Sequence, residues 1–372
     1  MFDYHHPIYR KLLVLLNVFI IIAYLLVCFV PFVNTGINWI VALAGLVFPL
    51  LVLALLLFIL LWIIVRSKWL WVSLVTLLLG FQQIAAVFSF HFHKEFSLQK
   101  GNNILRVMHW NLQNWGNEQE KVEDGEQTFV PYMMDLIEVN NADVLCFSEY
   151  TDKRNDKDTN SHISALAKAG YPYHLFAPTD TSSGSVEQGV AIFSKYPIIH
   201  SEVFNYGKHA SAEHLIYTDI TAGKDTFRIF TTHLQSVHFQ GADYRSLSRL
   251  KRARDPGYSD SRSIVSKLKN GYWHRYLQAQ IVKQKLSESP YPVVLTGDFN
   301  DVPNSNTYFT IKGNLQDAFL KKGSWVGRTF RLISPTLRID YILADRKFKV
   351  DQFDIMHVRY SDHYPIIADL QY

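Results

Sequence analysis

The chain has 372 residues, of which 48% are hydrophobic and only 19% are charged. Its net charge of +4 is too small to indicate nucleic-acid binding by itself, and its two cysteines are too few for a zinc cluster. Cys28 lies in an apolar run and Cys146 in a predicted buried strand, so we expect no disulfide. Charged residues are nearly absent from residues 12–90 and gather after residue 93, which predicts a membrane part followed by a globular part.

Three apolar stretches near the N-terminus reach the roughly 20 residues that a helix needs to cross a bilayer. They are residues 12–33, 37–65 and 69–90. The second contains Pro49, which predicts a tilt or a kink, and the third is the weakest because it includes two adjacent glutamines. The first stretch is too long for a cleaved signal peptide. We therefore expect residues 1–93 to form a membrane anchor with three transmembrane helices.

The positions of lysine and arginine in the short loops predict the orientation of this anchor. Arg10 and Lys11 precede the first stretch, and Arg66 and Lys68 separate the second from the third. This pattern places the N-terminus and the second loop in the cytoplasm. An odd number of spans then puts the C-terminal part outside the cytoplasm, at a plasma or inner membrane, with the lipid bilayer as its partner.

Residues 94–103 are predicted to be a linker, and short apolar runs punctuated by turns follow from residue 104. Seven of these runs are predicted strands, at 104–110, 143–147, 189–194, 227–232, 292–296, 339–343 and 366–370. Helices are expected at 128–139, 162–169 and 273–286. Several strands are apolar at successive positions, as in sheets covered on both faces. The interspersed order predicts an α/β domain over residues 104–372, with helices flanking β-sheets.

One stretch of this domain, residues 240–285, is rich in arginine and lysine. We interpret it as a long basic excursion that ends in the helix expected at 273–286. It is suited to a nucleic-acid backbone or to anionic lipid headgroups. A solvated loop without either role is an equally good interpretation.

Polar residues recur where the predicted strands end, which is where α/β sheets collect ligands. They are Asn111, Glu149, His233, Asp298, Asn300, Asp340, Asp362 and His363. Carboxylates such as Glu149 and Asp362 suit Mg²⁺ or Mn²⁺. Asp298 is suited to orient or deprotonate a water molecule, and Asn300 to donate a hydrogen bond to phosphate. The histidines are each expected to pair with a carboxylate. These residue types together predict hydrolysis of a phosphate ester.

The motifs WN, SE, GVAIFSKYP, THL, GDFND, IDYIL and SDH occur in this order between residues 104 and 372. The ordered set resembles the motif series of the endonuclease/exonuclease/phosphatase superfamily. The resemblance implies a four-layer α/β sandwich, in which two sheets are flanked by helices. It also implies that the enzyme depends on Mg²⁺ or Mn²⁺. The chain departs from many members at Ser148, where they carry glutamine.

The resemblance further implies a role for each matching residue. Glu149 and Asp362 would bind or adjoin the metal, and Asn111 would shape the metal and phosphate site. His233 would contact phosphate and act as a general acid, and Asn300 would bind phosphate. Asp298 would activate water, while Asp340 would orient His363.

Simpler interpretations apply to several of the neighbouring residues. Asp340 is positioned in the sequence to pair with Arg338, and Asp301 fits a turn. His109, His238 and Tyr364 are interpreted as packing or surface residues.

Three functions remain open from the sequence. The first is a metal-dependent phosphodiesterase that acts on nucleic acid or on a phospholipid headgroup. The second is a phosphomonoesterase acting on a small sugar, inositol or nucleotide phosphate. The third is a catalytically silent membrane protein that uses the fold for binding. No feature of the sequence requires an obligate protein partner.

Overall fold

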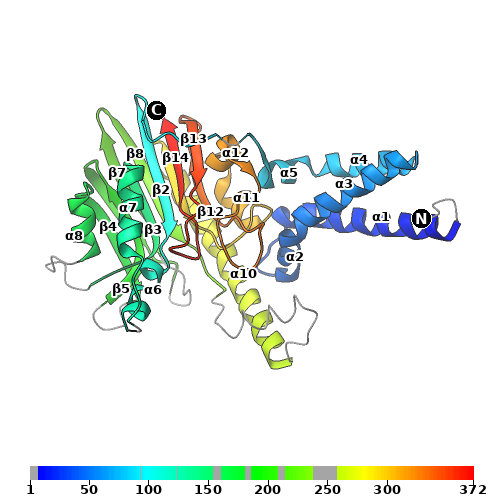
Figure 1. Ribbon diagram of the computed structural model, residues 1–372, viewed down its shortest axis with the longest axis horizontal. Helices are drawn as coiled ribbons and strands as arrows, with labels where there is room; N and C mark the ends of the chain where they lie inside the picture. Colours follow the sequence, from blue (N-terminus) through cyan, green and yellow to red (C-terminus); the bar gives the residue numbers. More distant parts are fainter. Residues whose placement is uncertain are drawn as a thin grey trace.

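The structure is a computed structural model, and it describes residues 7–92, 94–123, 125–153, 161–180, 186–207, 214–237 and 258–372. Figure 1 shows a bundle of N-terminal helices that projects from one side of an α/β domain. The helices are coloured blue, and the domain runs from cyan to red.

The N-terminal helices only partly match the three predicted spans. Two helical segments, Ile8–Phe32 and Trp39–Ile64, are long and apolar enough to cross a membrane. The third predicted span is broken, because its two helices are bent by 61° and make a span only if they are taken together. Each segment consists of more than one helix. The first contains α1 Pro7–Cys28 and η1 Val30–Phe32, and the second contains α2 Trp39–Ala44, η2 Gly45–Val47 and α3 Phe48–Ile64. The third contains α4 Trp69–Leu79 and α5 Phe81–Val87.

The bend in the third span has a local cause at Gly80. A Cβ atom at this position would lie 2.0 Å from the hydroxyl oxygen of Tyr24, so only glycine allows this close approach to α1. Just after the bend, the Gln83 amide donates a hydrogen bond to the carbonyl of Cys28. The two glutamines that weakened the prediction therefore mark a real interruption. Pro49 lies in the first turn of α3, where proline is tolerated, and the irregular turn η2 precedes it.

Two six-stranded sheets form the α/β domain. The first has the order β13-β14-β2-β3-β5-β4. Its strands in chain order are β2 Ile104–Asn111, β3 Val144–Lys153, β4 Tyr173–Asp180, β5 Val186–Ser194, β13 Lys349–Ile355 and β14 Ile366–Gln371.

The second sheet has the strand order β10-β12-β9-β8-β7-β6. Its strands are β6 Ile198–Phe204, β7 Leu215–Ala222, β8 Asp225–His233, β9 Val293–Asp298, β10 Gln316–Asp317 and β12 Asp340–Ala344. A separate pair, β1 Ser89–Phe90 and β11 Ser324–Trp325, lies beside the N-terminal helices.

The layers follow from where the apolar side chains are buried. One hydrophobic core contains residues from both sheets, including Val107 and Ile229, and it lies between them. A second core joins the first sheet to α7 Val130–Asn140 and α8 His162–Lys168. A third joins the second sheet to α10 Tyr258–Ser287 and α11 Asn306–Lys312. The predicted fold class, a four-layer α/β sandwich, is confirmed.

The remaining helices border this sandwich: α6 Gln113–Glu123 follows β2, and α12 Ala318–Lys322 follows β10. The seven predicted strands are all present, with ends that shift by a few residues. The structure adds β1, β4, β6, β7, β10, β11 and β13, and it starts α10 at Tyr258 instead of residue 273. The second half of the predicted basic excursion is therefore helical, and its residues 240–257 lie outside the described residues. Cys28 and Cys146 are both buried and free.

Candidate active site

The candidate site lies where strands of the two sheets end next to each other. In the first sheet β2 and β3 run parallel, with Asn111 opposite Ser148, so Glu149 comes directly after this pair. In the second sheet β8 and β9 run parallel, and His233 lies opposite Asp298. Because β12 is antiparallel to β9, the first residue of β12, Asp340, also lies opposite Asp298. Five strands thus bring polar side chains together at one edge of the two sheets.

Asp298 is at the centre of this group and is 1% exposed. Its Oδ1 accepts a hydrogen bond from the backbone N–H of Asn300 at 2.8 Å. Its Oδ2 accepts one from the Asn111 amide at 3.1 Å. The Nε2 atoms of His233 and His363 approach the same Oδ2 at 3.7 and 3.6 Å. Two imidazoles and an amide are thus directed at one carboxylate oxygen.

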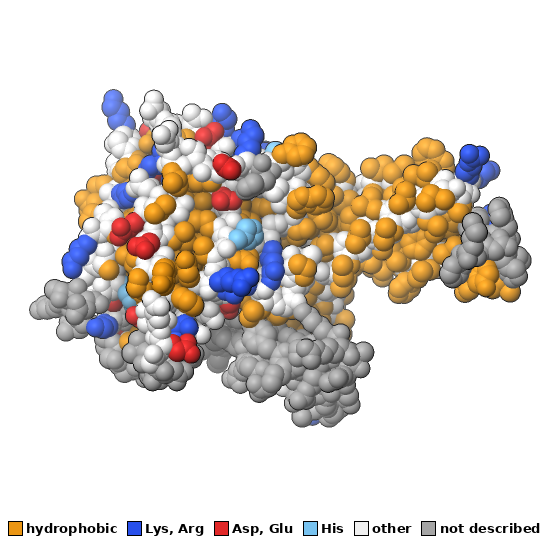
Figure 2. All heavy atoms as spheres, in the orientation of Figure 1, with side chains coloured by type: hydrophobic (Ala, Val, Ile, Leu, Met, Phe, Trp, Pro, Cys, Tyr) orange, Lys and Arg blue, Asp and Glu red, His pale blue; other side chains and the backbone are white. Residues whose placement is uncertain are grey.

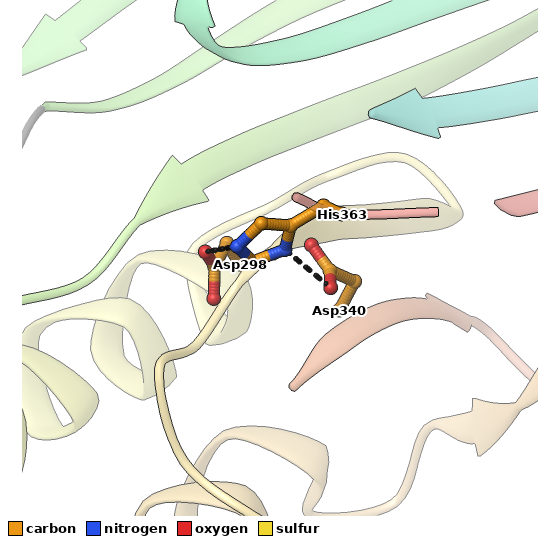
Figure 3. A group of neighbouring side chains, drawn as sticks. All are labelled: Asp298, Asp340 and His363. Carbon is orange, nitrogen blue, oxygen red and sulfur yellow. Dashed lines mark hydrogen bonds and ion pairs between the residues drawn. The ribbon is translucent and has the colours of Figure 1, made fainter. Parts of the chain in front are cut away.

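Across the His363 ring from Asp298 is a second buried carboxylate, that of Asp340 (Figure 3). Its Oδ2 accepts a hydrogen bond from Nδ1 of His363 at 2.9 Å. Its Oδ1 lies 3.3 Å from Nε2 of His109, whose side chain is completely buried. Asp340 is therefore flanked by two imidazoles, those of His363 and His109. Arg338 does not pair with Asp340, because its guanidinium binds Asp317 at 2.7 Å instead.

The charges in this group shift three pKa values. Burial raises the pKa of Asp298 above its ordinary value, and the negative Asp340 raises it further, although both histidines oppose this. Burial also disfavours charge on Asp340, but the two adjacent imidazoles outweigh this and hold its pKa well below the usual range. Burial likewise opposes charge on His363, yet Asp340 and Asp298 raise its pKa well above the ordinary value. The two carboxylates therefore favour the protonated form of His363.

The backbone is held in an unusual conformation at two site residues. Glu149 has a φ of 48° and Asn300 a φ of 51°, in the left-handed region that residues with a Cβ atom seldom adopt. Such strain persists where the surrounding structure fixes a functional side chain. At Glu149 the regular pairing of β3 with β5 is also interrupted, between Phe147 and Tyr150. At both residues the backbone thus departs from regular strand geometry where the side chain lies at the site.

The donor atoms around Asn111 fit a hard divalent cation. The Asn111 amide nitrogen donates hydrogen bonds to Glu149 Oε1 and to Asp298 Oδ2, both at 3.1 Å, so two carboxylate oxygens meet here. The amide oxygen of Asn111 accepts from the backbone N–H of Gln113. The Glu149 side chain is 28% exposed, which leaves room for water on a bound ion. Mg²⁺ and Mn²⁺ favour oxygen ligands and retain water in this way. Asp298, Asp340 and His363 form a further group whose ligand atoms lie within 4.8 Å of one another.

The other predicted site residues lie at the border of this group. Asp362 is next to His363, and its backbone N–H donates to the Gln113 side chain. Its carboxylate oxygen lies 3.4 Å from the Ser361 hydroxyl. The Asn300 side chain donates one hydrogen bond to the carbonyl of Leu234, and within the described part of the chain its second amide hydrogen has no acceptor.

The sequence interpretation missed the place of His109 beside Asp340. His109 is two residues before Asn111 on β2, so the two side chains lie on the same face of the strand, and this period could have identified it. Asp301 is the turn residue that the sequence predicts, because its carboxylate accepts a hydrogen bond from the N–H of Val302. The same carboxylate is buried and lies 3.7 Å from the guanidinium of Arg275. Tyr364 packs its ring on His357, in agreement with a packing role, and His238 lies outside the described residues.

Two sequence families match separate parts of the chain. The Endonuclease/Exonuclease/phosphatase family matches residues 128–363, which is more than half of the chain. The chain belongs to this family. A domain family of unknown function matches residues 10–87, which contain the N-terminal helices. No curated protein matches the chain by sequence.

Solved structures of this family have a similar fold. An endonuclease/exonuclease/phosphatase from Beutenbergia cavernae DSM 12333 is 20% identical, with 73% of this chain and 72% of that chain covered and a TM-score of 0.51. The human Nocturnin catalytic domain is 17% identical, with coverages of 72% and 93% and a TM-score of 0.50. A family protein from Leptotrichia buccalis C-1013-b is 16% identical, with coverages of 72% and 100% and a TM-score of 0.50. At these identities the likeness concerns the fold alone.

Proposed function

We propose that this family member is a divalent-metal-dependent hydrolase of phosphate esters, and more specifically a phosphodiesterase. The observation that supports this most strongly is the approach of two imidazoles and an amide to the one buried carboxylate oxygen of Asp298. A buried carboxylate in this setting is suited to take a proton from water, since its raised pKa makes it a stronger base.

The proposed reaction adds water to phosphorus and breaks the bond to the leaving oxygen. Asp298 orients the water and accepts its proton. His363, held by Asp340, directs an imidazolium toward the negative phosphoryl oxygens. His233 contacts the phosphate and donates a proton to the leaving oxygen, so that one alcohol and one phosphate product form. The second amide hydrogen of Asn300 binds a phosphoryl oxygen.

Asn111 and Glu149 are the proposed first ligands of the ion, and Asp362 is proposed to lie near it. A bound Mg²⁺ or Mn²⁺ would neutralise charge on the phosphate and make phosphorus more electrophilic. The role of the described residues is to fix the phosphate against Asp298 and to supply and remove protons.

A phosphomonoesterase that acts on a small sugar, inositol or nucleotide phosphate is the alternative. The same groups support it, since a monoester differs only in carrying one more negative oxygen. A catalytically silent binding protein is a weaker proposal because every predicted catalytic position carries its reactive side chain.

The membrane part of the proposal is that residues 1–93 anchor the enzyme with the catalytic domain outside the cytoplasm. The start of α1 and the turn between α3 and α4 lie at the same end of the bundle, remote from the α/β domain (Figure 1). Arg10 and Lys11 belong to the start of α1, and Arg66 and Lys68 to that turn. Basic residues favour the cytoplasmic side, which supports this orientation. A reporter enzyme fused after Tyr372 tests it: activity of the reporter only in the cytoplasm would refute it.

The proposed chemistry is tested with the purified full-length chain and two chromogenic esters. We expect bis(p-nitrophenyl) phosphate to be hydrolysed in Mg²⁺ and not in EDTA, and faster than p-nitrophenyl phosphate. The substitution Asp298→Asn removes the base and should lower kcat by about 100-fold or more. Asp351→Asn, at an exposed position on β13, is the matched control and should retain activity. Preference for the monoester would favour the alternative, and equal activity of Asp298→Asn and wild type would refute the site.

A further inference from the structure

The loop that follows Asn300 is attached to the end of the first N-terminal helix. The Asn304 amide donates to the carbonyl of Val27 at 3.2 Å, and the Asn306 amide donates to that of Pro31 at 2.8 Å. The irregular turn after α2 closes on the same loop: a Cβ atom at Gly45 would lie 2.4 Å from the carbonyl oxygen of Asn304. The loop carrying the candidate site is thus in direct contact with the helices.

A second contact comes from the segment that leads into β12. The guanidinium of Arg338 is 1% exposed and is shared between two partners. It donates to the Asp317 carboxylate at 2.7 Å and to the carbonyl of Ala86, in α5, at 2.9 Å. Arg338 is two residues before Asp340, so a short, fully buried connection joins the end of the last apolar helix to the carboxylate that holds His363.

A third contact is the small sheet formed by β1 and β11. β1 begins two residues after α5, and it pairs with β11 through Ser89 opposite Trp325 and Phe90 opposite Ser324. The Ser89 hydroxyl also donates to the carbonyl of Gly323 at 2.6 Å. The chain that leaves β11 reaches Phe330, whose backbone forms a bridge with His363.

These contacts limit the distance between the candidate site and the ends of the apolar helices. An extended chain covers at most about 3.6 Å per residue. Asn300 is therefore within about 14 Å of Asn304, and Phe330 within about 18 Å of Trp325. The polar layer on each side of a bilayer core is about 5 to 8 Å thick. A phosphate ester in that layer is thus close to the site when the helices span the membrane.

The surface around the third contact has the composition of a membrane-facing edge. Phe90, Phe92 and Trp325 are 75%, 93% and 79% exposed, although all three are large and apolar. Aromatic side chains of this kind favour the boundary between lipid and water. Figure 2 shows that the hydrophobic surface of the helices extends onto the adjoining edge of the α/β domain. The apolar surface is therefore continuous from the helices to the domain that carries the site.

We infer that the natural substrate is a phosphate ester carried by a membrane lipid, located in the leaflet that adjoins the catalytic domain. The inference rests on the proposed function, and it selects one of the substrate classes left open there. A lipid is favoured over a nucleic acid because three contacts hold the site at a fixed height beside the apolar helices. The exposed aromatic edge, which continues the apolar surface of the helices, likewise suits a bilayer surface.

The substrate class is tested with one reactive diester presented in two ways. The full-length protein is placed in phosphatidylcholine nanodiscs and given phosphatidyl-p-nitrophenol with either two palmitoyl or two butyryl chains. We expect kcat/KM to be at least tenfold higher for the long-chain ester, which enters the bilayer. Equal or faster cleavage of the water-soluble ester, or faster nicking of supercoiled DNA, would overturn the inference. A protein that cleaves neither ester, nor bis(p-nitrophenyl) phosphate, would instead refute the proposed function.

A second measurement tests the position of the site without using activity. Leu332, two residues after Phe330 and 39% exposed, is replaced by cysteine and labelled with a fluorophore. Lys168→Cys is the control, because it is exposed on α8, on the side of the domain away from the N-terminal helices (Figure 1). We expect lipids with a nitroxide headgroup to quench the label at position 332 and not at 168. Equal quenching, or no quenching at position 332, would overturn the inference.

Discussion

Asp340 illustrates what the sequence reveals at the scale of single residues. Its pairing with His363 was predicted from the ordered motifs, and the 2.9 Å hydrogen bond agrees with that prediction. The contact with His109 was not predicted, because a histidine on an otherwise apolar strand is more often a packing residue. Which of two nearby groups a carboxylate pairs with depends on the spacing between strands that are far apart in sequence. The same spacing between strands places Arg338 next to Asp317, so it pairs with Asp317 and not with Asp340.

The pair of Asp340 and His363 should make stability depend on pH in a bell-shaped way. Because the pKa of Asp340 is lowered on folding, its contribution is present above about pH 4 and is lost as pH falls. Because the pKa of His363 is raised on folding, its contribution is complete below about pH 6.5 and is lost as pH rises through the raised value. The substitution Asp340→Asn should therefore cost most between these limits, by about 3 kcal/mol.

This dependence is measured as the difference in unfolding temperature between the wild type and Asp340→Asn across the pH range. The exposed variant Asp351→Asn serves as the control, and its difference from the wild type should stay near zero at every pH. A difference for Asp340→Asn that is the same at acidic, neutral and alkaline pH would contradict the assignment of this ion pair.

At the scale of elements, burial decided which strands were predictable. β2, β9 and β12 are buried at every position, and their continuous apolar runs identified them. β6 is exposed along most of its length, so its sequence lacks both the apolar run and a clear alternation. The long helix α10 was predicted only in its second half, because the first half is dominated by basic and small polar residues. Hydrophobic periodicity therefore fails where an element has little contact with the core.

The glycine of the GDFND motif has a packing role that can be tested. A Cβ atom at Gly297 would lie 2.3 Å from the carbonyl oxygen of Thr232 on the neighbouring strand β8. Gly297→Ala should therefore push β8 away from β9, which separates His233 from Asp298. We expect a lower unfolding temperature and a loss of kcat on the order of 10- to 100-fold, since small displacements of reacting groups are costly.

The matched control for this substitution is Gly101→Ala, where the nearest atom would be at an ordinary 3.6 Å. It should leave both stability and kcat unchanged. Wild-type kcat and unfolding temperature in Gly297→Ala would show that the two strands tolerate separation, contrary to the role described for this glycine.

At the scale of the whole molecule, the sequence predicted the two parts but not how they are joined. The apolar helices and the domain were assigned separately from composition and motifs. The hydrogen bond between Asn304 and Val27 joins residues 277 positions apart, and no local pattern reports such a contact. The predicted linker is likewise not a free connection: the carbonyls of Ser97 and Leu98 both accept hydrogen bonds from Arg106 of β2.

If the helices position the site, a change within them should impair catalysis. Gly45→Ala would introduce a Cβ atom against the Asn304 carbonyl and displace the loop that follows Asn300. We expect kcat of the full-length protein in nanodiscs to fall on the order of 10- to 100-fold. Leu53→Ala, at a side chain of α3 that is 53% exposed, is the control and should retain activity. Full activity of Gly45→Ala would indicate that the helices serve only as a tether.

Direct addition of water to phosphorus at Asp298 is the step on which the proposed function depends. It is tested by a single turnover of bis(p-nitrophenyl) phosphate with Mg²⁺ in water labelled with heavy oxygen. We expect the wild-type protein to release p-nitrophenyl phosphate that carries one labelled oxygen, and Asp298→Asn to release almost none. Label in the p-nitrophenol, or no hydrolysis by folded, metal-loaded protein, would contradict the assignment of this site.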